Sequence, residues 1–235
     1  MTRKIHVIRT VFVCLHFAGH VNSSHSLFAK EAESFTDHSK SKEDWSLVFQ
    51  EEFSNDRIGS EPENLFILDG AFSVGIEEKN LILVLPGNPV GEFGFLFGPR
   101  LREKSMELQF SFKSENKGRR YPSFAACLGG VRGFRVRLNP ASRKMILYYE
   151  DEHLEEVPFT WKSKKWYNMR IQAVRLPTKQ SMYKIKLWQA SQNEPLGWHF
   201  TYRAEIEFES GKCAVWGYPY SGLSICFDNL NILAR

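Results

Sequence analysis

The most acidic stretch of the chain, Tyr149 to Glu156 (YEDEHLEE), carries the residue type that cleaves glycosidic bonds. A retaining glycosidase uses two carboxyl groups about 5–5.5 Å apart, one as acid and one as nucleophile. On a strand, residues two apart point the same way, so Glu150 and Glu152 would share a face, and Glu155 is a third candidate. The stretch also has the composition of a hairpin end, where acids are simply solvated. Both interpretations stay open.

Aromatic residues make up 14% of the sequence. Sugar rings stack their C–H faces on Trp and Tyr, while polar side chains satisfy the hydroxyl groups. The densest aromatic cluster is Trp216-Gly-Tyr218-Pro-Tyr220, and Tyr121, beside Arg119 in a basic loop, is a candidate second wall. Glycine and proline around the tyrosines favour a loop that presents them outward. The alternative is that Trp216 is a core residue at the end of a strand.

Short alternating segments must position these side chains. Apolar residues alternate with polar ones over many runs separated by turn residues, which is typical of strands with one solvated face. The clearest runs are 45–49, 72–76, 81–85, 106–112, 134–138, 145–149, 169–173, 183–187 and 202–208. No convincing amphipathic helix and no fixed repeat occurs, so the sequence predicts an all-β sandwich with antiparallel sheets.

The start of the chain has the order of a secretory signal peptide. A short basic segment precedes an uncharged apolar run, Thr10–Gly19, and small residues follow it. We expect a signal peptide over residues 1–29, cut between Ser23 and Ala29, then a flexible lead-in over 30–44 and one domain over 45–235. The apolar run is about half the roughly 20 residues that cross a bilayer, so no transmembrane segment is expected after cleavage. The sequence predicts a secreted, periplasmic or extracellular protein, with its oligomeric state open.

Composition limits the other functions. Arg3, Lys4 and Arg9 supply three of the four net positive charges, so the mature chain gives no argument for a nucleic-acid partner. The cysteines have no zinc spacing. Cys213 and Cys226 flank a predicted turn, and one disulfide between them is one interpretation. Alternatively, Cys127, Cys213 and Cys226 are buried thiols that pack as small apolar groups.

Several stretches resemble, in order, the motifs of concanavalin A-like lectin/glucanase domains. The similar stretches are Trp45–Phe53 (an acidic-aromatic opening strand), Leu68–Val74 with Asn80–Leu83 (a G-x-W-x-V … G-x-L hairpin), Trp166–Ile171 (W-Y-x-L-R), Lys184–Trp198 (a strand and an EP-x-x-W loop) and Phe227–Leu230 (an FDN-V close). The branch concerned includes laminin-G-like domains and the 3-keto-disaccharide hydrolase-like jelly rolls. The resemblance implies a two-sheet jelly roll, adjacent first and last strands, and frequent use on carbohydrates.

The resemblance bears on two candidate sites. If the first and last strands are neighbours, Glu51 or Glu52 would approach Asp228, where the last strand changes parity, and Ca²⁺ suits such carboxylates. Relatives often carry a structural calcium at such a place; the alternative is that Asp228 accepts hydrogen bonds from backbone amides and holds no ion. Laminarinase-like members carry E-x-D-x-x-E on one strand. Here, residues 150–155 read EDEHLE, without the central aspartate.

Three functions follow from these observations. The first is an exported jelly-roll domain that binds carbohydrate without catalysis, using Trp216, Tyr218, Tyr220, Tyr121 and Arg119. The second is a glycoside- or 3-keto-disaccharide-hydrolase-like enzyme. The third is a structural or protein-interaction sandwich at the cell surface. One fold hosts all three, so the site must decide between them.

Overall fold

The computed structural model describes residues 44–89, 91–177 and 179–235, so the expected signal peptide and nearly all of the lead-in lie outside the described residues. The described strands are β1 (Ser46–Glu51), β2 (Leu65–Asp69), β3 (Ser73–Glu77), β4 (Asn80–Leu85), β5 (Phe93–Phe97), β6 (Met106–Ser114), β7 (Ser123–Leu128), β8 (Phe134–Asn139), β9 (Lys144–Tyr149), β10 (Glu152–Pro158), β11 (Tyr167–Arg175), β12 (Ser181–Gln189), β13 (Phe200–Ala204), β14 (Cys213–Tyr218) and β15 (Ile225–Ala234). No helix long and apolar enough to span a bilayer occurs in these residues.

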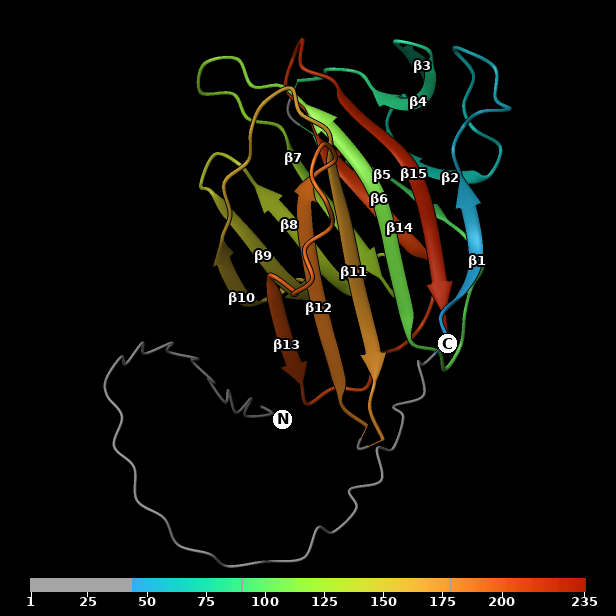
Figure 1. Cartoon of the computed structure of the whole chain (residues 1–235). Helices are drawn as coiled ribbons and strands as arrows, with labels where there is room; N and C mark the ends of the chain where they lie inside the picture. The colour runs from blue at the N-terminus through green and yellow to red at the C-terminus, as the bar shows by residue number, and fades with distance from the viewer. Residues whose placement is uncertain (1–43, 90, 178) are drawn as a thin grey trace, which may run out of the picture. The chain divides into compact units, whose positions relative to one another are not determined.

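The strands form two antiparallel sheets of a jelly-roll sandwich, which confirms the predicted fold class. Sheet A has the order β13-β12-β11-β6-β15-β4-β3, with β1 also paired to β15; sheet B has the order β10-β9-β8-β7-β14-β5-β2. Figure 1 shows sheet A in front of sheet B. The first and last strands of the domain are neighbours, as the resemblance implied.

The core lies between the sheets, where the apolar residues of each alternating strand point. Phe227 of β15 is at its centre, with no exposed surface. The Phe227 ring centroid lies 6.0–6.5 Å from those of Phe72, Phe95, Phe110 and Phe124, which belong to or adjoin strands of both sheets. Such aromatic packing joins the two layers through side chains alone.

The last strand changes its neighbour halfway along. Its first half pairs with β4 and its second half with β1, while β6 lies along its other side. Between the halves the register to β6 shifts, and Asn229 takes a left-handed φ of 54°. The parity change in the sequence is therefore a β-bulge. It keeps apolar side chains of both halves in the core, namely Ile225, Phe227, Leu230 and Ile232.

Cys213 and Cys226 do not form a disulfide in the structure. Cys127, Cys213 and Cys226 are all free thiols. Cys213 lies on β14 of sheet B and Cys226 on β15 of sheet A, so the turn between them separates two layers instead of closing a hairpin. Burial raises the pKa of the Cys127 thiol to about 12 and that of Cys226 to about 11.

Phe227→Ala should destabilise the domain by about 3–5 kcal/mol, because it removes a ring that contacts both layers and leaves a cavity. Chemical denaturation measures the free energy of unfolding. Phe66→Ala is the matched control, since Phe66 of β2 is 64% exposed; its cost should be about 0.5 kcal/mol or less. Equal costs for the two variants would contradict the placement of Phe227.

Thiol titration tests the state of the cysteines. In a Cys14→Ser variant handled without reductant, the native protein should react slowly at pH 8, because burial raises the thiol pKa values. In guanidinium chloride, three thiols should react per chain. A single reactive thiol in the unfolded chain would show that a disulfide forms after all.

Candidate functional site

The outer face of sheet B gathers aromatic and cationic side chains around β14. Val215 of β14 points into the core, so Trp216 and Tyr218 point to the opposite side of the sheet. Leu96 of β5 packs against the same cluster, and the other neighbouring outward residues are small or charged. Ala125 of β7 and Ala214 of β14 pack around Trp216, and β8 adds Arg135 and Arg137, which alternate with buried apolar residues. We call this surface the sheet-B face.

Trp216 lies within a strand and not in a loop, which corrects the expected outward display of this residue. Its side chain is only 6% exposed. The indole lies over Gly94 of β5, where an added Cβ would come within 2.4 Å of the ring. The Arg135 guanidinium carbon is 5.7 Å from the ring centroid. Trp216 therefore forms the floor of the sheet-B face and supports the residues above it.

Arg135 is held by charges and rings on several strands. Its Nη2 is 2.6 Å from Asp151 Oδ1, and its Nη1 is 3.3 Å from Glu92 Oε1. Its guanidinium carbon lies 5.6 Å from the ring centroid of Tyr148 on β9. Because two carboxylates face one guanidinium, the charge of Arg135 is compensated within the protein.

Arg137 has the opposite situation. Its guanidinium carbon lies 4.0 Å from the ring centroid of Tyr218, a close cation–π contact. Its buried Nε has no hydrogen-bond acceptor, and no described carboxylate forms an ion pair with it. Arg137 is a preorganised, half-buried cation with hydrogen-bond donors to offer to a ligand.

Tyr218 ties the two arginines to the edge of the site. Its hydroxyl donates to Glu92 Oε1 at 2.7 Å, the same carboxylate oxygen that faces Arg135. Burial raises the pKa of the Tyr218 hydroxyl well above its usual value of 10, and the nearby Glu92 carboxylate raises it further. The phenol is therefore a fixed donor, and its ring stays in place under Arg137.

The other residues expected at the aromatic site lie apart from this cluster. Tyr220 is half-buried, and its carbonyl accepts the Leu223 N–H in a tight turn. Tyr121 packs edge-on against Trp161, with ring centroids 6.4 Å apart. Arg119 is exposed in the turn between Lys117 and Arg120. Of the five predicted ligand residues, the structure joins only Trp216 and Tyr218 in one cluster.

The acidic stretch forms the hairpin end that was the second interpretation. Glu150 and Asp151 have φ values of 48° and 69° and make the two-residue turn between β9 and β10. The expectation that Glu150 and Glu152 lie two apart on one strand is wrong, because the strand begins at Glu152. Beyond a bulge in β10, Glu155 pairs with Leu147. A catalytic role for Glu150, Glu152 or Glu155 stays a prediction.

The carboxylates proposed for calcium have separate partners. Glu51 accepts from the Phe53 N–H at 2.8 Å and from Asn64 at 2.7 Å, and Glu52 accepts from Gln50 at 2.6 Å. Asp228 accepts from the Asn229 N–H at the bulge, at 2.8 Å, and from Asn80 at 2.7 Å. Burial raises the pKa of the Asp228 carboxyl.

Among the described residues, no group of three or more His, Cys, Asp or Glu side chains could hold a metal. The backbone bond of Asp228 at the bulge agrees with the alternative interpretation of that residue. Calcium at Glu51, Glu52 and Asp228 stays a prediction.

Sequence reasoning missed Arg135, Arg137, Tyr148 and Glu92 as site residues. The signal for the arginines was present, because Arg135 and Arg137 alternate with Phe134, Val136 and Leu138 and must share the solvent side of one strand. Their neighbours were not visible in the sequence. Glu92 lies just before β5 and Tyr148 lies on β9, and only the strand order of sheet B brings both to Arg135.

No family model matches the chain, and no curated protein matches it. Similar solved structures include the carbohydrate recognition domain of Emp47p, at 10% identity over 80% of this chain and 96% of that chain (TM-score 0.52). A marine PL-14 alginate lyase from Aplysia kurodai matches at 12% identity over 81% and 100% (TM-score 0.55). Lectin II from Ulex europaeus matches at 11% identity over 81% and 100% (TM-score 0.52). These structures share the concanavalin A-like jelly roll, which confirms the resemblance at the level of the fold.

Tyr218 can be titrated by the tyrosinate absorbance of wild type minus that of Tyr218→Phe. Since the fold raises its pKa, the hydroxyl should ionise only well above pH 10, and the stability that its bond contributes should be lost as the pH rises through that pKa. Glu92→Gln removes the negative charge that raises the pKa of Tyr218 in addition to burial, so the hydroxyl of this variant should ionise closer to pH 10. Ionisation of Tyr218 at pH 10 in the wild type would contradict its burial and its bond to Glu92.

Proposed function

We propose that this chain, a concanavalin A-like jelly roll, binds carbohydrate on the sheet-B face and performs no chemistry on it. The observation that carries the proposal is Arg137, a half-buried cation stacked on Tyr218 without an ion-pair partner among the described residues. A half-buried guanidinium without a carboxylate partner is costly, and a ligand that brings oxygen acceptors to its side chain lowers that cost. Emp47p and the Ulex protein, whose names describe carbohydrate recognition and a lectin, support this choice of ligand.

The bound sugar contacts two kinds of group in this proposal. The ring of Tyr148 packs against the apolar C–H face of a sugar ring, while the ring of Tyr218 supports Arg137. Arg137 donates hydrogen bonds to ring or hydroxyl oxygens, which are strong because the donor is charged. Arg135, Glu92 and Asp151 form a paired set that holds the tyrosines and orients the face.

Binding without catalysis is favoured because the carboxylates on the sheet-B face are already paired with Arg135. Glu92 and Asp151 both accept from Arg135, so neither is a free carboxyl group of the kind that protonates a leaving group. The enzyme remains the rival function, because one similar structure is an alginate lyase. Export to a secreted, periplasmic or extracellular location is part of the proposal and rests on the signal-like residues 1–29.

Arg137→Gln should weaken carbohydrate binding by about tenfold or more, because a charged hydrogen bond is worth about 1.5–3 kcal/mol. A glycan array identifies ligands of the wild type, and isothermal titration then measures Kd for wild type and variant. Arg203→Gln on β13, at the edge of the other sheet, is the control for loss of one positive charge and should leave Kd unchanged.

Three results would count against the proposal. Failure of the wild type to bind any glycan removes carbohydrate as the ligand. Unchanged binding by Arg137→Gln moves the site away from the sheet-B face. Shorter oligosaccharides in the incubated mixture, detected by mass spectrometry, would make the protein an enzyme.

A further inference from the structure

A cavity of about 320 Å³ lies on the outer face of sheet A, on the side of the sandwich opposite the sheet-B face. Asn80, Ser111, Trp166, Asn168, Asp228 and Asn229 line it. Since liquid water occupies about 30 Å³ per molecule, the cavity has the volume of about ten waters, enough for one monosaccharide unit. We call it the bulge pocket, because Asp228 and Asn229 belong to the bulge of β15.

The polar side chains of the bulge pocket form one hydrogen-bonded row across four strands. Asn80 of β4 donates to Asp228 Oδ2 at 2.7 Å. Asn229 donates to Asp228 Oδ2 at 3.2 Å and to Ser111 Oγ at 3.4 Å. Ser111 of β6 donates in turn to Asn168 Oδ1 of β11 at 2.8 Å. The register places Asp228, Ser111 and Asn168 at one level of the sheet, so the row is built into the strand pairing.

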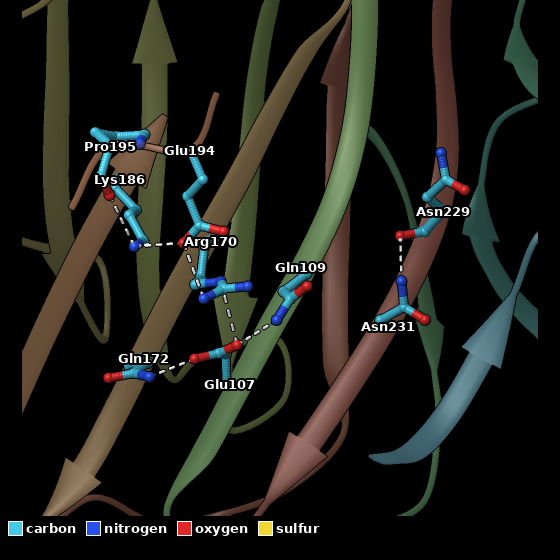
Figure 2. Close-up of polar contacts among 9 residues, drawn as sticks. All are labelled: Glu107, Gln109, Arg170, Gln172, Lys186, Glu194, Pro195, Asn229 and Asn231. Carbon is cyan, nitrogen blue, oxygen red and sulfur yellow. Dashed lines mark hydrogen bonds and ion pairs between the residues drawn. The ribbon is translucent and has the colours of Figure 1, made fainter. Parts of the chain in front are cut away.

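A second polar network on the same face differs from this row because its charged side chains pair with one another. Figure 2 shows Glu107 contacting Gln109, Gln172 and Arg170, and Glu194 contacting Arg170 and Lys186. The Arg170–Glu107 and Arg170–Glu194 ion pairs measure 3.3 and 2.9 Å, and Lys186 also donates to the Pro195 carbonyl at 3.2 Å. Two cations and two anions compensate one another, so this network offers a ligand no unpaired charge, although the buried Nε of Arg170 has no hydrogen-bond acceptor.

The bulge pocket, in contrast, has hydrogen-bond donors and acceptors that no described residue uses. Asn168 uses its Oδ1 within the row, and its amide donors bond to no described residue. Asp228 Oδ1 accepts only the Asn229 N–H, although a carboxylate oxygen can accept two hydrogen bonds. The Trp166 indole lines the same cavity as an apolar surface, with Lys113 Nζ 5.3 Å from its ring centroid. Donors, acceptors and a flat aromatic ring in one cavity suit a hydroxyl-rich ring.

The charges of the bulge pocket limit that ligand further. Glu77, Glu78 and Asp228 line it, and only Glu77 has a cationic partner, Lys113, among the described residues. An anionic ligand would therefore be repelled. The described acids do not converge on a metal-binding arrangement.

We infer that the bulge pocket is a second binding site, which accepts one uncharged pyranose unit of a glycan. It does not depend on the sheet-B face. A chain with both sites has two binding surfaces on opposite sides and can link two glycan segments.

The probes are the methyl glycosides of glucose, galactose, mannose and N-acetylglucosamine, with methyl glucuronide as the charged comparison. Saturation-transfer NMR detects binding to the full chain. At least one neutral glycoside should bind the wild type, and binding should be lost in Ala190→Trp, which fills the rim of the pocket without removing any hydrogen bond. Asn168→Ala should weaken binding at least tenfold.

Matched controls separate this site from the sheet-B face. Ala141→Trp makes the same change at an exposed alanine in the turn between β8 and β9 and should bind the neutral glycoside as the wild type does. Because Arg137→Gln disables the proposed sheet-B site, the loss of binding caused by Ala190→Trp should also be measured in that background, where it should be complete. The inference is overturned if no neutral glycoside binds, if Ala190→Trp binds normally, or if methyl glucuronide binds more tightly than the neutral glycosides. A rise in melting temperature with Ca²⁺ that Asp228→Asn abolishes would also overturn it, because the pocket would then hold a cation.

Discussion

The bulge in β15 is the constraint on which the rest of the structure depends. The first half of β15 pairs with β4 and its second half with β1, and both halves bury apolar residues. The apolar residues stand at odd positions in the first half and at even positions in the second. A regular strand would turn one of these two sets away from the core. The left-handed Asn229 resolves this conflict, and Asp228 accepts its N–H. Through this one irregularity the first and last described strands pair, Phe227 reaches the centre of the core, and a buried carboxylate lies on the outside of sheet A.

The sandwich also separates two chemical environments. Each strand turns one side to the common core, so the outward residues of sheets A and B lie on opposite sides of the sandwich. Sheet B presents stacked arginines and rings, with one cation uncompensated. Sheet A presents amides and carboxylates around a cavity, next to a closed ion-pair network. The same apolar interior supports stacked arginines on one side and a cavity lined by amides and carboxylates on the other.

Much of the fold was predictable from the sequence, because alternation is a local signal. The runs around Phe110, Val136 and Ile171 predicted their strands, and the parity change at Asp228 predicted an irregularity. β7 was missed because Ala125 and Cys127 are covered on the outer face too, so its segment does not alternate. The residues of the site were harder to predict from the sequence. Glu92, Arg137 and Tyr148 come together only through the strand order and register of sheet B, which are long-range properties. Glu150 was misjudged because a turn residue does not follow strand periodicity.

Gly94 and Trp216 lie on neighbouring strands and occupy one volume between them. Any side chain at position 94 would displace the indole and, with it, the guanidinium of Arg135 above. In a set of descendants of this gene, the two positions should therefore change as a pair: bulk gained at 94 must be matched by bulk lost at 216. A glycine at position 94 in every descendant would reflect the space that the Trp216 indole occupies, and not a backbone conformation that only glycine adopts.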